Sequence, residues 1–291
     1  MTGYPPQDWR KVRRRLRRRE AWRRMLALAR RPLMVAVIVV LAAGGAVAGI
    51  TAGPASRGIS AGCQKVFVPA YFGTGTWTQA INSKPAPSAL ILNPATGVGA
   101  GRAPNRAYQS VVRQARAAGS AVLGYSSTAD GLRPVAQVEA DVRNYHAWYG
   151  VTGIFLDRVN GVSSKLSYYE QLAGYIHRAI PGSSVWLNAG IYPERQYMSV
   201  GDVLMVFEGT FTQYRDIVVP GWARGFPADR FASTIYGASS SSQANDAIRL
   251  SRSRNVGYIY VTNLTGSNPY DALPGYWSSE DAALRAGCRA H

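Results

Sequence analysis

The chain has 291 residues and a formal net charge of +17, and that charge is distributed unevenly. Residues 1–32 hold 12 Lys or Arg against Asp8 and Glu20, a net charge of +10, whereas the remaining 259 residues carry only +7. A basic block that abuts an uncharged apolar stretch is the usual signal of membrane topology. Nucleic-acid binding is the competing interpretation of the basic block, but its position beside the apolar stretch favours membrane topology, and we expect no nucleic-acid partner.

The apolar stretch is residues 33–52, which contain no charged side chain and are mostly Val, Ala, Leu, Ile and Gly. A helix of this length crosses a bilayer core of roughly 30 Å. Arginines lie on its N-terminal side only, so the positive-inside rule predicts a basic cytoplasmic tail at 1–32. We expect an uncleaved transmembrane signal-anchor at 33–52, a short linker at 53–62 and one extracellular domain at 63–291.

Other fates of the export segment remain open. Cleavage near Ala46-Val47-Ala48, a small-x-small pattern, would release a secreted protein. Arg30-Arg31 is a partial twin-arginine signal, and Ser60-Ala61-Gly62-Cys63 resembles a lipidation site. The length of the apolar stretch favours the uncleaved anchor.

The two cysteines, Cys63 and Cys288, bracket the exported part of the chain. An extracellular location permits disulfides, and a fold that closes on itself brings its first and last elements together. We therefore expect a Cys63–Cys288 disulfide, with two unpaired thiols as the alternative. The three histidines show no ligand spacing, and we expect neither a metal nor another cofactor.

Eight short apolar runs predict strands. In chain order they are residues 66–72, 89–93, 121–125, 153–157, 184–188, 203–208, 231–236 and 256–263. The run at 153–157 is apolar up to its last residue, Asp157, as expected of a strand buried on both faces.

Apolar residues with the helical period of 3.6 separate these strands. The predicted helices are one capped by Asn105 and ended by Gly119, one at 135–149, one at 168–179, one at 243–252 capped within the Ser-rich residues 239–242, and a last one from Ser278 or Ser279 to Gly287. Strands recur every 20–30 residues, as parallel crossovers require. The pattern predicts a (β/α)8 TIM-type barrel, with a doubly wound open sheet as the alternative.

Polar residues stand where the predicted strands end. In order they are Tyr71, Asn93, Tyr125 with Ser127, Asp157, Asn188, Glu208, Tyr236 and Asn263. Functional residues of such barrels lie at these ends, so we predict that this set lines a substrate site. The alternative is that strands simply become polar as they leave the core.

Two of these residues, Asp157 and Glu208, are carboxylates, and such a pair suits cleavage of a glycosidic bond. One strand separates theirs, which places the two backbones roughly 9–10 Å apart and leaves both retaining and inverting chemistry open. Aromatic rings that can stack on sugars are expected at the same face. They are Tyr71, Phe72, Trp77, Tyr125, Tyr192, Phe211, Tyr214, Trp222, Tyr236, Tyr276 and Trp277.

An ordered series of short motifs covers most of the exported domain. It comprises Val68-Pro69-Ala70-Tyr71 with Trp77, Leu90-Ile91-Leu92-Asn93-Pro94, Tyr108, Val122-Leu123-Gly124-Tyr125 with Thr128, Asp141, Tyr145, Trp148-Tyr149, Gly153-Ile154-Phe155-Leu156-Asp157, Asn188-Ala189-Gly190, Asp202 and Val206-Phe207-Glu208. Over about residues 66–264 this series resembles the spherulation-specific family 4, the spherulin-4-like proteins. The resemblance implies a TIM-type barrel related to endo-α-1,4-polygalactosaminidase-like glycoside hydrolases, with Asp157 and Glu208 matching their acidic residues.

One departure from the family pattern concerns the catalytic pair. The family commonly has Asp-Glu at the end of the fourth strand, whereas this chain has Asp157-Arg158. Because residues alternate along a strand, we expect Arg158 to point away from Asp157. A nearby guanidinium favours ionised Asp157, so we assign nucleophile or base to Asp157 and acid to Glu208.

These observations lead to two main hypotheses. The first is a membrane-tethered extracellular glycoside hydrolase that acts on an amino-sugar polymer or related polysaccharide; a net charge of +7 on the exported part favours an anionic or acetylated glycan. The second, motivated by Arg158, is a non-catalytic carbohydrate-binding barrel of the cell envelope. A structural envelope protein with a vestigial site is a third possibility.

Overall fold

The computed structural model describes residues 64–95, 97–98 and 103–277. The predicted tail, signal-anchor and linker, both cysteines and the predicted last helix lie outside these residues. Within the described part of the chain, no helix is long and apolar enough to cross a membrane.

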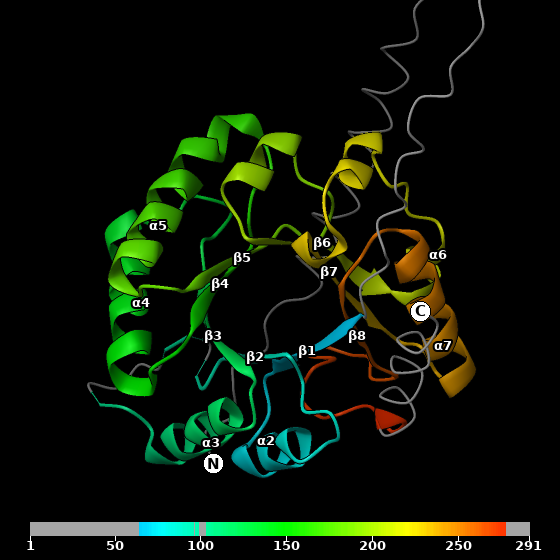
Figure 1. Ribbon diagram of the computed structural model, residues 1–291, viewed down its shortest axis with the longest axis horizontal. Coiled ribbons are helices and arrows are strands. Elements are labelled where there is room, and N and C mark those ends of the chain that lie inside the picture. Colours follow the sequence, from blue (N-terminus) through cyan, green and yellow to red (C-terminus); the bar gives the residue numbers. More distant parts are fainter. Residues whose placement is uncertain (1–63, 96, 99–102, 278–291) are drawn as a thin grey trace, which may run out of the picture. The chain divides into compact units, whose positions relative to one another are not determined.

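Eight parallel strands pair in chain order, and the last pairs with the first, so the sheet closes into a barrel (Figure 1). The strands are β1 (Lys65–Ala70), β2 (Ala89–Leu92), β3 (Ala121–Ser127), β4 (Gly153–Asp157), β5 (Ser184–Asn188), β6 (Val203–Thr210), β7 (Phe231–Tyr236) and β8 (Tyr258–Val261). Two register pairs make the closure, Lys65 with Tyr258 and Val66 with Ile259. The predicted TIM-type barrel is confirmed, and the open sheet is excluded.

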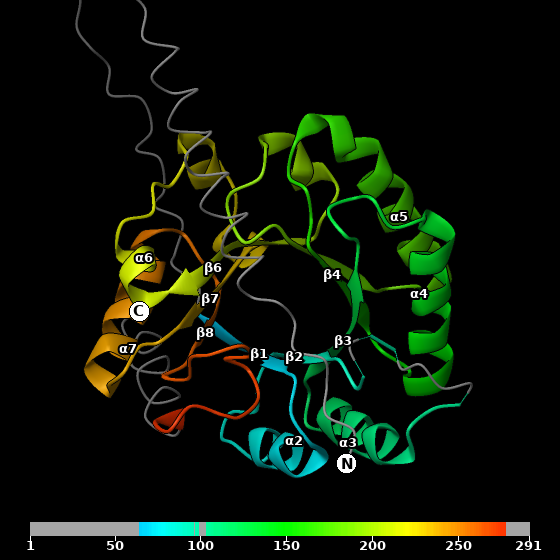
Figure 2. The ribbon, with the colours of Figure 1, turned by 180° about the vertical axis from the view of Figure 1, so that it is seen from behind.

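Helices lie outside the ring of strands, with α2 packed beside α3 and α4 beside α5 (Figure 2). They are α2 (Thr74–Ile81), α3 (Arg106–Ala117), α4 (Val135–Tyr149), α5 (Leu166–Ala179), the short α6 (Phe211–Arg215) and α7 (Ser241–Ser253). Short 3-10 turns fill other connections, at η1 (Ser163–Lys165), η2 (Arg195–Ser199), η3 (Gly221–Gly225) and η4 (Ala228–Arg230). The connection from β5 to β6 therefore holds η2 and no α-helix.

The predicted helix caps are present. The side chain of Asn105 accepts hydrogen bonds from the N–H groups of Ala107 and Tyr108 at the start of α3. Ser240 accepts from the N–H of Gln243 at the start of α7. These bonds satisfy N–H groups that the first turn of a helix leaves unpaired, and so they fix where each helix begins.

The burial of the strands explains their apolar sequences. Every residue of β2 and β4 is buried, so the continuous apolar runs do report strands covered on both faces. The buried face of α5 contains Leu172 and Ile176 as predicted, but it contains Tyr169 in place of the predicted Tyr168, which is half-buried. Because Tyr168 and Tyr169 are neighbours and both have apolar rings, the sequence alone does not determine which of them faces the core.

Element boundaries moved by a few residues at the barrel ends. β1, β2 and β8 stop at Ala70, Leu92 and Val261, so Tyr71, Asn93 and Asn263 lie in the loops that follow them. β6 is longer than predicted and carries a register shift against β7 between Met205 and Phe207. Such a bulge redirects the side chains beyond it, and here it immediately precedes Glu208.

Candidate active site

Asp157 ends β4 and is 9% exposed. Its Oδ2 accepts a hydrogen bond of 2.6 Å from the Tyr125 hydroxyl, and its Oδ1 accepts one of 2.7 Å from the Asn188 amide. Burial raises the pKa of Asp157, while these bonds and the backbone N–H and charge of Arg158 act in the opposite direction. The carboxylate is thus buried but well supplied with donors.

Glu208 stands on β6 and is half-buried. Its Oε2 accepts from the Asn188 amide at 2.8 Å, and its Oε1 accepts from the Tyr270 hydroxyl at 3.0 Å. Burial first, and then the charge of Asp157, raise the pKa of Glu208 to about 7. A carboxyl group with this pKa is about half protonated at pH 7, whereas an ordinary glutamate is almost fully ionised there.

Asn188 lies between the two acids and ties them together. Its single Nδ2 atom lies 2.7 Å from Asp157 Oδ1 and 2.8 Å from Glu208 Oε2, so these two oxygens are at most about 5.5 Å apart. That limit falls within the spacing of about 5–5.5 Å typical of retaining glycosidases and below the 6.5–9.5 Å or so of inverting ones.

An aromatic wall encloses the pair. Tyr71 is half-buried and meets the rings of Tyr125 and Tyr270 edge-on, with centroids 5.7 and 5.9 Å away. Burial and the charges of Asp157 and Glu208 raise the pKa of Tyr71 well above its usual range. Its hydroxyl therefore keeps its proton and can donate a hydrogen bond to a ligand in the barrel mouth.

Tyr270 is a site residue that sequence reasoning missed. It follows β8 in an irregular segment, is 1% exposed, and its hydroxyl also lies 3.3 Å from Thr234 Oγ1 on β7. No periodicity marks such a segment, and only the closing of the barrel brings it beside Glu208. An aromatic hydroxyl shortly after the last strand was the one signal available.

The remaining predicted binding residues lie at the same end of the barrel. Asn93 Oδ1 accepts from the N–H of Gly97 at 2.5 Å, Asn263 Oδ1 accepts from that of Gly275 at 2.9 Å, and Ser127 Oγ accepts from that of Ala129 at 3.4 Å. These three side chains hold loops of the mouth. Tyr236 is half-buried at the end of β7. Contact of these four residues with substrate stays a prediction.

Several aromatic residues expected at the mouth have structural roles instead. Trp77 is fully buried in α2 and donates through its indole N–H to the carbonyl of Ala70. Tyr214 is buried beneath the guanidinium of Arg254, which lies 4.7 Å from its ring centroid. Neither ring can stack on a sugar, because neither face is open to solvent.

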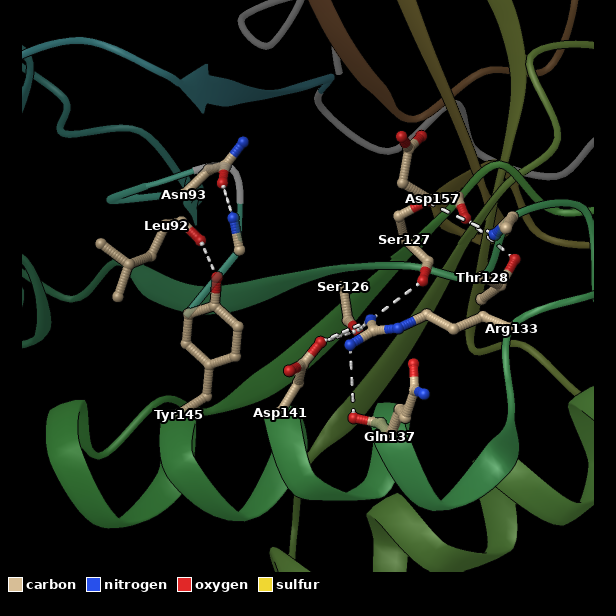
Figure 3. A network of polar contacts seen from close by, with 12 residues as sticks. Leu92, Asn93, Ser126, Ser127, Thr128, Arg133, Gln137, Asp141, Tyr145 and Asp157 are labelled. Atoms are coloured by element: carbon tan, nitrogen blue, oxygen red, sulfur yellow. Dashed lines mark hydrogen bonds and ion pairs between the residues drawn. The ribbon is translucent and has the colours of Figure 1, made fainter. Parts of the chain in front are cut away.

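The end of β3 is clamped onto α4 by Arg133 (Figure 3). Its Nη1 lies 2.6 Å from Asp141 Oδ2, 3.1 Å from Ser126 Oγ and 3.1 Å from the Ser127 carbonyl, and its Nη2 donates to Gln137. The next N–H along the chain, that of Thr128, donates to the carbonyl of Asp157 at 2.9 Å. The clamp thereby connects α4 with the backbone of Asp157.

Arg158 follows directly after β4 and adopts a φ of +55°. Its guanidinium points to the β3–α4 loop, where Nη2 lies 3.0 Å from Asp130 Oδ2. Its side chain thus pairs with Asp130, while its positive charge still acts to lower the pKa of Asp157. Among the described residues, no group of three or more His, Cys, Asp or Glu side chains could hold a metal ion.

The protein is thus a closed eight-stranded parallel barrel in which two carboxylates share one amide donor at the carboxyl ends of the strands, where such barrels carry their functional residues. Residues 65–284 match the spherulation-specific family 4. The chain therefore belongs to this family, as its sequence motifs predicted.

Individual relatives are more distant. Spherulin-4 of Physarum polycephalum is 27% identical over 235 residues, which cover 76% of this chain and 70% of that protein. The crystal structure of Aspergillus clavatus Sph3 in complex with GalNAc has a TM-score of 0.67 at 23% identity and covers 77% of this chain and 98% of its own. A chitinase from Chromobacterium violaceum has a TM-score of 0.51 at 12% identity, covering 78% and 100%. At these identities the structural likeness shows the fold.

Proposed function

We propose that the protein is a retaining glycoside hydrolase in which Asp157 and Glu208 are the catalytic carboxylates. The observation that carries the proposal is the Asn188 bridge, which holds one oxygen of each acid within hydrogen-bond distance of a single nitrogen. Membership of the family and the position of the pair at the carboxyl ends of the strands support it.

The two acids have environments that separate their roles. Asp157 accepts from Tyr125, Asn188 and the N–H of Arg158, all of which favour its ionised form. Glu208 has two such donors and faces the charge of Asp157, which favours its protonated form. The single proton that the pair shares near neutral pH therefore resides on Glu208.

In the first step, the ionised Asp157 carboxylate attacks the anomeric carbon of the sugar. The bond from that carbon to the glycosidic oxygen breaks, and the Glu208 proton passes to the departing oxygen. In the second step, Glu208, now ionised, removes a proton from water as the water attacks the anomeric carbon and releases Asp157. Each group thus returns to its initial state.

For the substrate, we propose a polysaccharide that contains an amino sugar or a related unit. The support comes from Sph3, a barrel of the same fold whose crystal structure contains GalNAc. Tyr71 is half-buried, so its ring can pack against a sugar face and its hydroxyl can bond the sugar. Tyr125 and Tyr270 are buried, and their hydroxyls hold the two carboxylates instead.

The test is release of reducing ends from a panel of polysaccharides by the purified chain and by its Glu208→Gln variant. Loss of the general acid is expected to lower kcat by about 10²–10⁴. Glu170→Gln, which removes an exposed carboxylate on the outer helix α5, is the matched control and should retain full activity. Activity that survives Glu208→Gln would contradict the assignment.

A non-catalytic carbohydrate-binding barrel is the second candidate, and the presence of Arg158 next to Asp157 favours it. This candidate predicts saturable binding of an oligosaccharide with no turnover by the unmodified chain. Turnover of any polysaccharide in the panel excludes it.

We further propose that the protein is anchored by residues 33–52 with the barrel outside the cell. The basic residues before this uncharged stretch support the orientation. Protease treatment of intact cells should remove an epitope tag placed after His291 and spare one placed before Met1. Recovery of the barrel from the culture medium, without the N-terminal tag, would favour cleavage instead.

A further inference from the structure

We propose that Arg158 selects a glycan carrying an acidic substituent, either a carboxylate or a sulfate ester, on the sugar unit beside Asp157. This inference rests on the proposed function, because it refines which glycan the same barrel mouth would bind.

The backbone fixes where the Arg158 side chain begins. Its φ of +55° is uncommon for a residue with a side chain. The carbonyl of Arg158 accepts from the N–H of Asp130 and from the Thr128 hydroxyl, each at 2.8 Å, and Asp130 itself has a φ of +63°. Two loops of the mouth therefore hold each other in an unusual conformation, of the kind that persists where a side chain must be aimed.

The guanidinium is only partly used by the protein. One nitrogen, Nη2, donates to Asp130 Oδ2, and no other described residue accepts a hydrogen bond from this group. The Arg158 side chain is 40% exposed, against 17% for that of Asp130. Because a guanidinium carries five N–H donors, most of them remain available to a ligand at the rim of the mouth.

A second cation reinforces the first. Lys165 Nζ donates to the carbonyl of Gly131 at 3.1 Å, and no carboxylate of the described residues pairs with it. Arg133 of the same loops is paired with Asp141 on α4, which leaves Arg158 and Lys165 as the cations beside Asp130. The donors of Arg158 that Asp130 does not use, with Lys165 nearby, favour an anion at this part of the rim.

The chemistry of the ligand follows from this arrangement. A guanidinium matches the planar oxygens of a carboxylate, or two oxygens of a sulfate ester, through paired N–H donors. A sugar with a free ammonium group beside Arg158 would be repelled by the guanidinium. The neighbourhood of Asp157 therefore distinguishes glycans by the sign of their substituent.

The experiment measures binding to the full chain carrying Glu208→Gln, so that no oligomer is cleaved. The probes are oligomers of equal length made of galacturonic acid, sulfated N-acetylgalactosamine, unmodified N-acetylgalactosamine or galactosamine. We expect at least one acidic oligomer to bind at least about tenfold more tightly than the neutral one, the value of one charge-assisted hydrogen bond. Comparing the first two probes shows whether the acid is a carboxylate or a sulfate.

Substitution of Arg158 decides the cause of that preference. Adding Arg158→Gln should bring the ratio of acidic to neutral affinity close to one, and Arg158→Lys should restore part of it. Adding Arg143→Gln, which removes an arginine from the outer helix α4, should leave the ratio unchanged. Equal binding of all four oligomers, or a preference that survives Arg158→Gln, overturns the proposal.

Cleavage of the same oligomers by the unmodified chain is scored separately. An Arg158-dependent preference without cleavage would refute the hydrolase and leave the selection intact. Cleavage without such a preference would refute the selection alone.

Discussion

Asn188 solves a problem that two neighbouring carboxylates create. Two ionised acids at this distance repel each other, and burial strengthens the repulsion. One amide group that donates to both carboxylates reduces this repulsion and limits their separation. An aspartate in its place would add a third negative charge. The neutral amide of Asn188 is therefore what allows the two carboxylates to lie so close together.

Tyr270 should set the upper pH limit of activity. Its hydroxyl donates to Glu208 and so lowers the pKa of that carboxyl, against the larger raising effects of burial and of Asp157. Because Glu208 acts as the proton donor, activity should fall as pH rises through about 7. Tyr270→Phe removes a bond to the ionised form, so the pKa of Glu208 rises and the descending limb of the kcat/KM profile moves to higher pH.

The matched control for this prediction is Tyr175→Phe. Tyr175 accepts from Arg143 between the outer helices α4 and α5, and none of the site residues bonds it. Its loss should leave the pH profile in place. A Tyr270→Phe profile that coincides with that of the unmodified chain would show that Glu208 is not the group that titrates.

At the scale of elements, the close approach of α4 to β3 depends on a glycine. A Cβ built on Gly124 would lie 2.5 Å from Cγ of Tyr145, and the Tyr145 hydroxyl donates to the carbonyl of Leu92 at 3.2 Å (Figure 3). The ring thus lies flat across β3 and reaches β2. Any side chain at position 124 would push it away.

Gly124→Ala is therefore expected to destabilise the barrel by about 1–3 kcal/mol, as overpacking of a core does. Gly75→Ala is the matched control, because a Cβ at Gly75 meets no atom within 4 Å and the residue lies in helix α2. Because Gly75 lies in the first turn of α2, Gly75→Ala should change the free energy of unfolding by no more than about 0.5 kcal/mol. Urea unfolding followed by tryptophan fluorescence measures both, and equal effects of the two alanines would contradict this account of Gly124.

Some helices and strands could be predicted from the sequence and others could not. β4 could be predicted because burial on both faces produces an uninterrupted apolar run, and α3 because Asn105 and a regular stripe mark it. Helix α2 was not predicted, because its buried residues, Trp77, Ala80 and Ile81, are few and glycines precede them. The helix is held to the end of β1 by the hydrogen bond from the Trp77 indole to the Ala70 carbonyl, a contact that no local sequence pattern indicates.

The sequence predicted which residues form the site, but it did not predict their distances. Asp157, Asn188 and Glu208 end or nearly end their strands, so chain order alone placed them at one mouth. Their separation was not predictable, because it depends on side-chain directions and on the bulge before Glu208. Tyr270 was beyond reach, since the position of an irregular segment is determined by tertiary contacts and not by local pattern.

For the whole molecule, the catalytic acid should reduce stability at high pH. The pKa of Glu208 is about 7 in the folded chain, against an ordinary value of 4.5. The unfolded chain therefore releases this proton at lower pH than the folded chain, so the free energy of unfolding falls as pH rises from about 4.5 to about 7. Glutamine in this position stays neutral and avoids the loss.

Glu208→Gln should consequently be more stable than the unmodified chain at pH 8, by on the order of 2 kcal/mol, with the difference shrinking towards pH 4.5. Urea unfolding at the two pH values provides the measurement. Glu170→Gln should show no such pH dependence, because that carboxylate is exposed. If the difference in free energy of unfolding between Glu208→Gln and the unmodified chain does not change with pH, then burial does not raise the pKa of Glu208.

The closing of the barrel also sets the order in which the site can come into being during synthesis. Asp157 and Glu208 emerge from the ribosome well before β8, and Tyr270 follows Glu208 by 62 residues. Until β8 pairs with β1, the ring is open and Glu208 lacks the hydroxyl that donates to it. During most of translation the nascent chain would therefore contain both carboxylates without a complete site. Activity would begin only after β8 and the segment that carries Tyr270 have been synthesised.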